Sequence, residues 1–180
     1  TSARHDLLCE EYRTKYPESF DTSMDKSISY CGKFRVTDTV DGLPLNVGKA
    51  ILSPTRTYAF VIKDILSEYR DKVNGIIHCS GGGQTKCKKF GHNVKYVKDN
   101  LFEIPPFFRL IHDTTGTDYR EMYQVFNMGH RMELYTDVKT AEQVIAIAAK
   151  YKIDAKIVGH IEQNDGNAVE ITSPNGVIKY

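Results

Sequence analysis

The chain has 180 residues, of which 41% are hydrophobic and 26% are charged, and its formal net charge is +1. This length suits one well-cored domain, and the composition is ordinary for a globular protein. The near-zero charge excludes a strong global field for nucleic acid or anionic membranes. No apolar run approaches the roughly 20 residues of a membrane-spanning helix.

The cysteines and the start of the chain bear on where the protein works. Cys9, Cys31, Cys79 and Cys87 contain no CxxC pair and are sparse for a disulfide scaffold, and no secretory leader is recognisable. We therefore expect a cytoplasmic protein. Because the chain starts at Thr1 without a methionine and enters a helical pattern almost at once, we also expect it to be the interior of a longer polypeptide.

The first part of the chain is predicted to hold one helix and a long connection. Apolar side chains at helical spacing predict a helix over 2–16, which Pro17 ends. Residues 17–48 are polar, turn-rich and weakly periodic. We expect an irregular connection there, with short strands near 27–31 and 33–37.

The clearest helix of the sequence opens at Pro54. Its apolar side chains recur at helical spacing and are assigned to packing: Tyr58, Val61, Ile62, Ile65, Leu66 and Tyr69. Asn74-Gly75 then predicts a turn into a strand over 76–79, which runs directly into three glycines.

The rest of the chain alternates strands and helices. Expected strands cover 94–98, 130–136, 155–161, 168–172 and 177–180, and expected helices begin at the Pro105-Pro106 pair, after Asp118, and at Thr140. In the strand over 130–136, Met132 and Leu134 are expected on the buried face. This order predicts one α+β domain over 1–180, with a mixed sheet covered by helices.

The glycine stretch Gly81-Gly82-Gly83 is the first candidate site. A backbone without side chains exposes successive N–H groups that can bind phosphate or carboxylate, although a tight ligand-free turn explains the same residues. Two nucleotide-binding patterns do not fit. A P-loop needs a second Gly before Lys86, and the GxGxxG fingerprint has Lys86 where its third Gly should stand.

Two polar residues flank this candidate. His78 ends an apolar strand, where an imidazole could bind phosphate or shuttle a proton; a core histidine with backbone partners is equally open. Arg56 is expected at a helix N-terminus, where it adds a bidentate fork to an anion-attracting helix end; the alternative is a surface Arg paired with a carboxylate. His130, beside Arg131, is predicted to be solvated; a position facing a cleft is the alternative.

The spacing of the cysteines and histidines does not match a zinc site. His78 and Cys79 are adjacent and point to opposite faces of a strand, and Cys87, His92 and His112 lack zinc-site spacing. We therefore expect no metal to be held by this chain.

Four runs, in order along the chain, together resemble one family. They are Asp41-Gly42-Leu43-Pro44-Leu45 with Leu52-Ser53-Pro54-Thr55-Arg56-Thr57-Tyr58, His78-Cys79-Ser80-Gly81-Gly82-Gly83, Glu121-Met122-Tyr123-Gln124-Val125-Phe126-Asn127-Met128-Gly129, and Ile157-Val158-Gly159-His160-Ile161. They resemble the DGxPL, LxPTRxY, HITGGG, EMYRTFNMG and IGxI segments of aminoimidazole ribonucleotide synthetases, also called phosphoribosylformylglycinamidine cyclo-ligases.

The resemblance implies that the chain is the C-terminal half of a two-domain enzyme with a three-layer α/β/α, partly ferredoxin-like fold. The implied reaction is the ATP-dependent closure of formylglycinamidine ribonucleotide to aminoimidazole ribonucleotide in purine synthesis. ATP and Mg²⁺ would be bound mainly by an N-terminal domain that also forms a homodimer. The isolated chain would then be inactive and hold no cofactor, with neither nucleic acid nor membrane as a partner.

The resemblance also implies roles for individual residues. The residues implied to bind substrate or phosphate are Arg56, Ser80, Gly81, Gly82, Gly83, Asn127 and Gly129. His78 is the implied catalytic group. Arg4 matches an Arg that follows a Ser-Asn-Gly element in the family.

The sequence departs from the family pattern at several positions. Cys87 and Lys89 stand, with Phe90, where the family has Asn, Pro and Arg, and His130 and Arg131 replace a small apolar residue and a Gly. These departures leave two alternatives open. One is a related ATP-dependent enzyme of the formylglycinamidine synthase, selenophosphate synthetase or hydrogenase maturation type, and the other is a non-catalytic ribonucleotide-binding domain.

Overall fold

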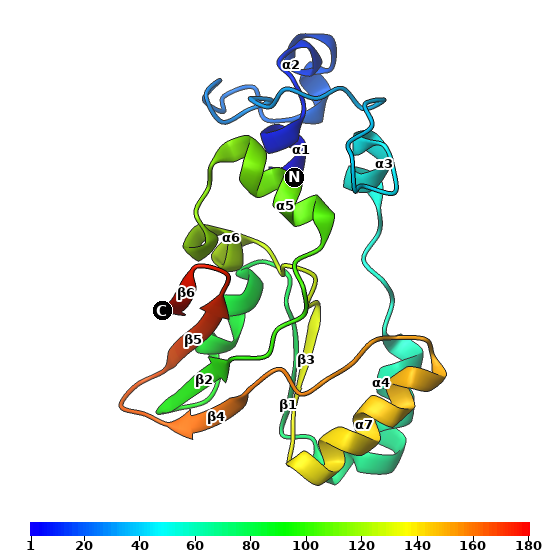
Figure 1. Cartoon of the computed structure of the whole chain (residues 1–180), viewed down its shortest axis with the longest axis vertical. Helices are drawn as coiled ribbons and strands as arrows, with labels where there is room; N and C mark the ends of the chain where they lie inside the picture. Colours follow the sequence, from blue (N-terminus) through cyan, green and yellow to red (C-terminus); the bar gives the residue numbers. More distant parts are fainter. The chain divides into compact units, whose positions relative to one another are not determined.

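The computed structural model describes all 180 residues, and Figure 1 traces the chain through its helices and strands. The chain forms two compact units. One consists of Thr1–Thr55 and Ile104–Asp118, and the other of Arg56–Glu103 and Tyr119–Tyr180. None of the helices has the length and apolar character that crossing a membrane requires. Whether the two units act as one domain stays a prediction.

The first unit holds short helices joined by irregular chain. They are α1 (Ser2–Leu7), α2 (Glu11–Lys15), the 3₁₀ turn η1 (Pro17–Ser19), α3 (Val47–Leu52) and α5 (Pro106–Thr115). The helix predicted at the Pro105-Pro106 pair is confirmed, and the connection over 17–48 is irregular between η1 and α3. The strands expected at 27–31 and 33–37 do not form, because backbone groups of this stretch hydrogen-bond to the first helical segment instead.

The helix predicted over 2–16 is broken into two pieces. Leu8 is extended, with φ −85° and ψ 143°, and forms an isolated bridge with Phe34. The N–H of Phe34 donates to the carbonyl of Leu7 at 2.9 Å, and the N–H of Cys9 donates to the carbonyl of Phe34 at 3.0 Å. A tertiary contact thus takes the backbone groups that a continuous helix would use for itself.

In the second unit, helices α4 (Ala59–Tyr69) and α7 (Val138–Lys150) pack against each other (Figure 1). The predicted apolar stripe is confirmed as core for every residue except Tyr58, which precedes α4 and lies outside the core cluster. The helix starts differ from those predicted: α4 begins at Ala59 rather than at Pro54, and α7 begins before Thr140. Asp137 is the true cap of α7, since its Oδ1 accepts the Thr140 backbone N–H at 2.9 Å.

A four-stranded mixed sheet also belongs to this unit. Its strands are β2 (Val94–Lys98), β4 (His160–Gln163), β5 (Ala168–Ser173) and β6 (Gly176–Lys179), in the order β4-β2-β5-β6. β2 is antiparallel to β4 and parallel to β5, which confirms the α+β class with a mixed sheet. The hairpin predicted at Asn175-Gly176 is confirmed, with Gly176 at φ 107°. The strand predicted over 155–161 starts only at His160.

A separate two-stranded ribbon pairs β1 (Gly75–His78) with β3 (Met132–Tyr135), and its two faces differ. One face carries Ile76 and Leu134, which pack on a core formed by side chains of both helices and by Val73, which follows α4 in the chain: Val61, Ile65, Val73, Val144, Ile147 and Ala148. The other face carries Glu133, which is 5% exposed. The alternating pattern therefore predicted the strand correctly but not that its polar residue is also buried.

Candidate functional site

The glycine loop follows β1 and begins with a tight turn. The N–H of Gly83 donates to the carbonyl of Ser80 at 2.8 Å, and Gly82 has φ 96° and ψ −1°. A positive φ at the third residue is what a type II turn requires, and glycine adopts it without strain. Gly82 is therefore explained by the turn.

Gly83 is explained by packing. It has φ 49° and starts the 3₁₀ helix η3 (Gly83–Lys89), which lies against helix α6 (Tyr119–Val125). A Cβ at this position would lie 2.4 Å from the carbonyl oxygen of Phe126 and 2.6 Å from that of Tyr123. Only glycine lets the two segments approach this closely.

Gly81 has neither explanation. It has no positive φ, and a Cβ there would meet nothing within 4 Å. It is exposed, and neither its N–H nor that of Gly82 donates a hydrogen bond within the chain. Two successive N–H groups that are left available to a ligand are the arrangement predicted for an anion site.

Side chains at the ends of the loop add polar groups. His78 is exposed, so the interpretation as a core histidine is wrong. Lys86, the residue at which both nucleotide-binding patterns fail, donates from Nζ to Ser80 Oγ at 2.8 Å and to the carbonyl of His78 at 3.0 Å. Lys86 lies three residues after Gly83, which is one turn of a 3₁₀ helix. This spacing brings its side chain back to the glycine loop and could have indicated Lys86 as a site residue from the sequence.

Asn127 and Gly129 form a second turn beside the glycine loop. The N–H of His130 donates to the carbonyl of Asn127 at 3.0 Å, and Met128 and Gly129 have φ 52° and 92°. Positive φ at both central residues defines a type I′ turn. Asn127 Oδ1 accepts the Gly129 N–H at 2.9 Å, so both predicted site residues also hold the turn together.

Arg56 does not lie where the sequence predicted. Because α4 begins at Ala59, Arg56 precedes the helix in an irregular segment rather than occupying its first turn. It is exposed, and its guanidinium donates from Nη1 to the carbonyl of Lys152 at 3.1 Å. No contact joins Arg56 to the glycine loop. The helix N-terminus proposed for an anion is therefore not part of this site.

A buried polar cluster connects the loop to the ribbon. Lys98 Nζ donates to Glu133 Oε1 and to the carbonyl of Gln84 at 2.7 Å, and the Lys98 and Glu133 side chains are only 5% and 4% exposed. Tyr135 donates its hydroxyl to Glu133 Oε2, and Cys79 Sγ donates to Oε1 at 3.4 Å. A buried carboxylate needs such partners to stay ionised.

The charges of this cluster are balanced. Burial alone would raise the pKa of Glu133, but the Lys98 ammonium, together with the hydrogen bonds from Lys98 and Tyr135, outweighs it and holds that pKa below its ordinary value. Burial, with the negative charge of Glu133, raises the pKa of Cys79 and Tyr135. Both therefore remain protonated and donate their hydrogen bonds to the carboxylate.

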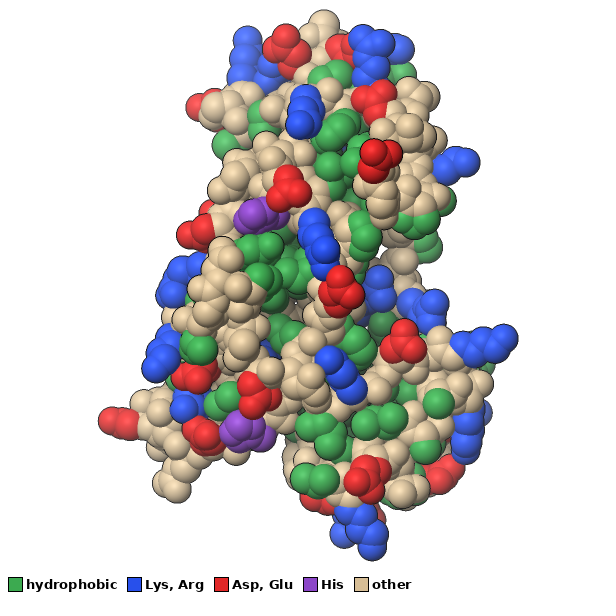
Figure 2. Space-filling model, viewed as in Figure 1, with side chains coloured by type: hydrophobic (Ala, Val, Ile, Leu, Met, Phe, Trp, Pro, Cys, Tyr) green, Lys and Arg blue, Asp and Glu red, His purple; other side chains and the backbone are tan.

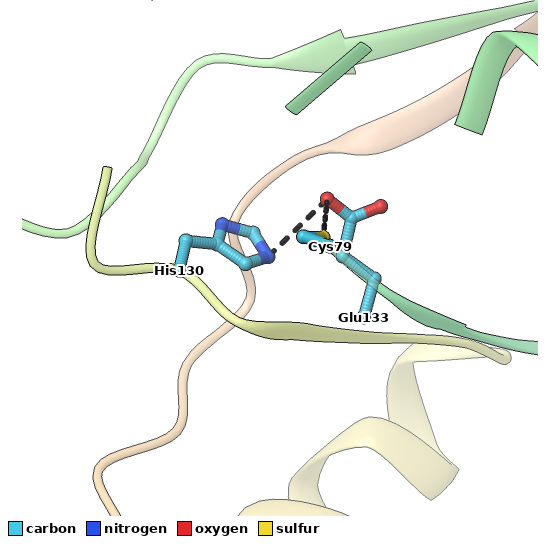
Figure 3. A group of neighbouring side chains, drawn as sticks. All are labelled: Cys79, His130 and Glu133. Atoms are coloured by element: carbon cyan, nitrogen blue, oxygen red, sulfur yellow. Dashed lines mark hydrogen bonds and ion pairs between the residues drawn. The ribbon is translucent and has the colours of Figure 1, made fainter. Parts of the chain in front are cut away.

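His130 is part of this cluster, so the prediction that it is solvated is wrong. It is 4% exposed, and its Nε2 lies 3.3 Å from Glu133 Oε1 (Figure 3). Burial lowers its pKa to about 4, so the ring is neutral near pH 7. Nε2 then carries the proton that faces the carboxylate, and Nδ1 is left as a buried acceptor without a partner.

Sequence spacing could not have revealed that Cys79, His130 and Glu133 meet. Their donor atoms all lie within 4.8 Å of one another, although Cys79 is far from the other two along the chain. Mg²⁺ prefers oxygen ligands, and only one of these three groups offers oxygen. The cation facing Glu133 is the Lys98 ammonium. The set is therefore a hydrogen-bonded cluster unsuited to Mg²⁺.

The family profile described as "AIR synthase related protein, C-terminal domain" matches residues 31–172. The chain belongs to this family. The profile includes the glycine loop, the Asn127–Gly129 turn and the buried cluster. The family expected from the sequence motifs is thereby confirmed.

Curated relatives agree with this assignment. The chain is 38% identical over 136 residues to a phosphoribosylformylglycinamidine cyclo-ligase of Methanopyrus kandleri, covering 74% of this chain and 39% of the relative. It is 35% identical over 135 residues to the enzyme of that name from Methanococcus vannielii, covering 73% and 38%. For Syntrophus aciditrophicus the identity is 30% over 151 residues, covering 78% and 41%. The chain thus spans about two fifths of the length of these AIR synthase relatives.

The chain is also similar to solved structures, among them a hydrogenase maturation protein. E. coli HypE, a hydrogenase maturation protein, matches with 17% sequence identity and a TM-score of 0.47, over 69% of this chain and 39% of that one.

Proposed function

We propose that this AIR synthase C-terminal domain works as part of an ATP-dependent cyclo-ligase that closes formylglycinamidine ribonucleotide to aminoimidazole ribonucleotide. The names of its relatives supply the reaction. The observation that carries the proposal is Gly81, an exposed glycine that neither a turn nor packing requires, with two successive N–H groups available beside Lys86. This loop would bind the phosphate group of the ribonucleotide.

The reaction needs phosphate clamping and stabilisation of developing negative charge. ATP would phosphorylate the formyl oxygen, a nitrogen of the substrate would attack that carbon to form the ring, and inorganic phosphate would leave. The N–H groups of Gly81 and Gly82 and the Lys86 ammonium are suited to hold phosphate oxygens. His78 would supply an imidazole at the loop for proton transfer. Asn127 and Gly129 would form the neighbouring wall.

The partners of the chain follow from the same proposal. An N-terminal domain would bind most of ATP and Mg²⁺ and would form a homodimer, so the chain alone would hydrolyse no ATP. All four cysteines are free, which suits the reducing cytoplasm. Figure 2 shows basic and acidic side chains interspersed over the face in view, so we propose no nucleic-acid partner.

The test compares Gly81→Val with Gly83→Ala in the full-length protein, with turnover and the melting temperature measured for both. The valine side chain introduced by Gly81→Val would obstruct the phosphate without meeting protein atoms within 4 Å of its Cβ. We expect KM for formylglycinamidine ribonucleotide to rise by at least about tenfold, the factor for about one lost hydrogen bond, with an unchanged melting temperature. Gly83→Ala should instead lower the melting temperature. A wild-type KM in stable Gly81→Val protein would contradict the proposal.

A further inference from the structure

Gln84 is a buried side chain that the reaction itself does not use. It follows Gly83 and is 0% exposed. Its Nε2 donates to the carbonyl of Asn127 at 2.6 Å and to the carbonyl of His130 at 2.9 Å. One amide group thereby joins the glycine loop to both ends of the type I′ turn.

Lys98 fixes the orientation of this amide. Its Nζ donates to Gln84 Oε1 at 3.1 Å, to the carbonyl of Gln84 at 2.7 Å and to Glu133 Oε1. An ammonium can only donate and has three protons, so all three are used and the Gln84 atom facing it must be the oxygen. The Gln84 NH₂ group must then face the two carbonyls, which can only accept.

Glu133 in turn holds Lys98 in place. Its carboxylate lies on β3, accepts from Lys98, and also accepts from Cys79 at the end of β1. The chain of contacts therefore runs from the rigid ribbon through the ammonium to Gln84, and from there to the two loops. Each donor in this chain of contacts has an acceptor, and buried hydrogen bonds that are connected in this way favour one geometry.

We propose that Gln84, oriented by Lys98, is a positioning residue that sets the glycine loop against the Asn127–Gly129 turn so that both contact the same ribonucleotide. Gln84 touches no substrate and acts only through the backbone of these loops. The inference rests on the proposed function for its ligand. The contact between the two loops, however, can be tested without that ligand.

The first experiment measures amide hydrogen exchange in Gln84→Met and Gln84→Glu variants of the 180-residue chain. Methionine keeps the shape of the side chain and removes both donors and the acceptor, whereas glutamate keeps an acceptor for Lys98 and removes the donors. In both variants the amide of His130 should exchange at least about tenfold faster, because the turn loses its anchor. The helix α4 amides, which lie outside the network, should keep their protection. Unchanged exchange at His130 in both variants would overturn the proposal.

The second experiment uses the full-length protein and separates KM from kcat. In the Gln84→Met and Gln84→Glu variants the displaced glycine loop should raise KM for formylglycinamidine ribonucleotide by about tenfold, while kcat stays within about twofold of the wild-type value. A purely structural role would lower the active fraction, and hence kcat, and leave KM unchanged; that outcome would overturn the proposal. If wild-type protein shows no turnover, the proposed function fails, and the exchange experiment decides positioning alone.

Discussion

The two faces of the β1–β3 ribbon are stabilised by different interactions, apolar packing on one and hydrogen bonds with an ion pair on the other. On one face Ile76 and Leu134 pack against apolar side chains of α4 and α7. On the other, Glu133 is buried among donors from Cys79, which directly follows β1, from Lys98 on β2 and from Tyr135 on β3. Apolar packing tolerates exchanges of similar volume, whereas the ionic face depends on each donor and acceptor being present. The glycine loop is attached to the ionic face, so its geometry depends on the less tolerant of the two.

The largest expected effect comes from breaking the ion pair. Lys98→Met leaves Glu133 as a buried charge without its cation, which should lower the free energy of unfolding by about 3–5 kcal/mol. Lys98→Met with Glu133→Gln removes both charges and should recover most of this loss. Urea denaturation of the two variants measures the difference. A double variant as unstable as Lys98→Met would show that the ionic face behaves like simple packing.

The second prediction concerns pH and His130. Its pKa is about 4 in the folded chain and near 6.5 when unfolded, so the unfolded state binds more protons between these values. Stability should therefore fall as pH drops from about 6.5 toward 4, by up to roughly 3 kcal/mol. His130→Gln keeps a donor for Glu133 and cannot titrate. Denaturation curves at several pH values should show a shallower loss in this variant, and equal slopes would contradict the assignment.

The smallest effect is expected on the apolar face. Ile65→Val removes one buried methyl group from the core and should cost about 0.5–1.5 kcal/mol. It should leave the exchange rate of the His130 amide unchanged, because no hydrogen bond connects α4 to the network. A change at His130 comparable to that in Gln84→Met would show that the two faces are not independent.

Local patterns predicted much of the fold. The α4 stripe, strand β2 and the Asn175-Gly176 hairpin follow from periodicity and turn chemistry within a few residues of sequence. Helix starts were less certain, since Pro54 permits a helix without forcing one at that position. Arg56 was misplaced for this reason.

The candidate site was predicted only in outline. The triple glycine pointed to an anion site, but Gly82, required by a turn, and Gly83, required by packing, look the same as Gly81 in sequence. The burial of His130 could not be predicted, because its partner Glu133 lies on a strand face that alternation assigns to solvent. Lys98 and Gln84 could not be paired at all, because their contact depends on how β2 and η3 meet in space.

The most direct test of phosphate binding by the glycine loop is a proton–nitrogen correlation spectrum of the 180-residue chain titrated with formylglycinamidine ribonucleotide. We expect saturable shifts that are largest at the amides of Gly81 and Gly82, with smaller shifts at Gly129, and we expect these shifts to be lost in Gly81→Val. Saturable binding that leaves the Gly81 and Gly82 amides unmoved would contradict phosphate binding by this loop.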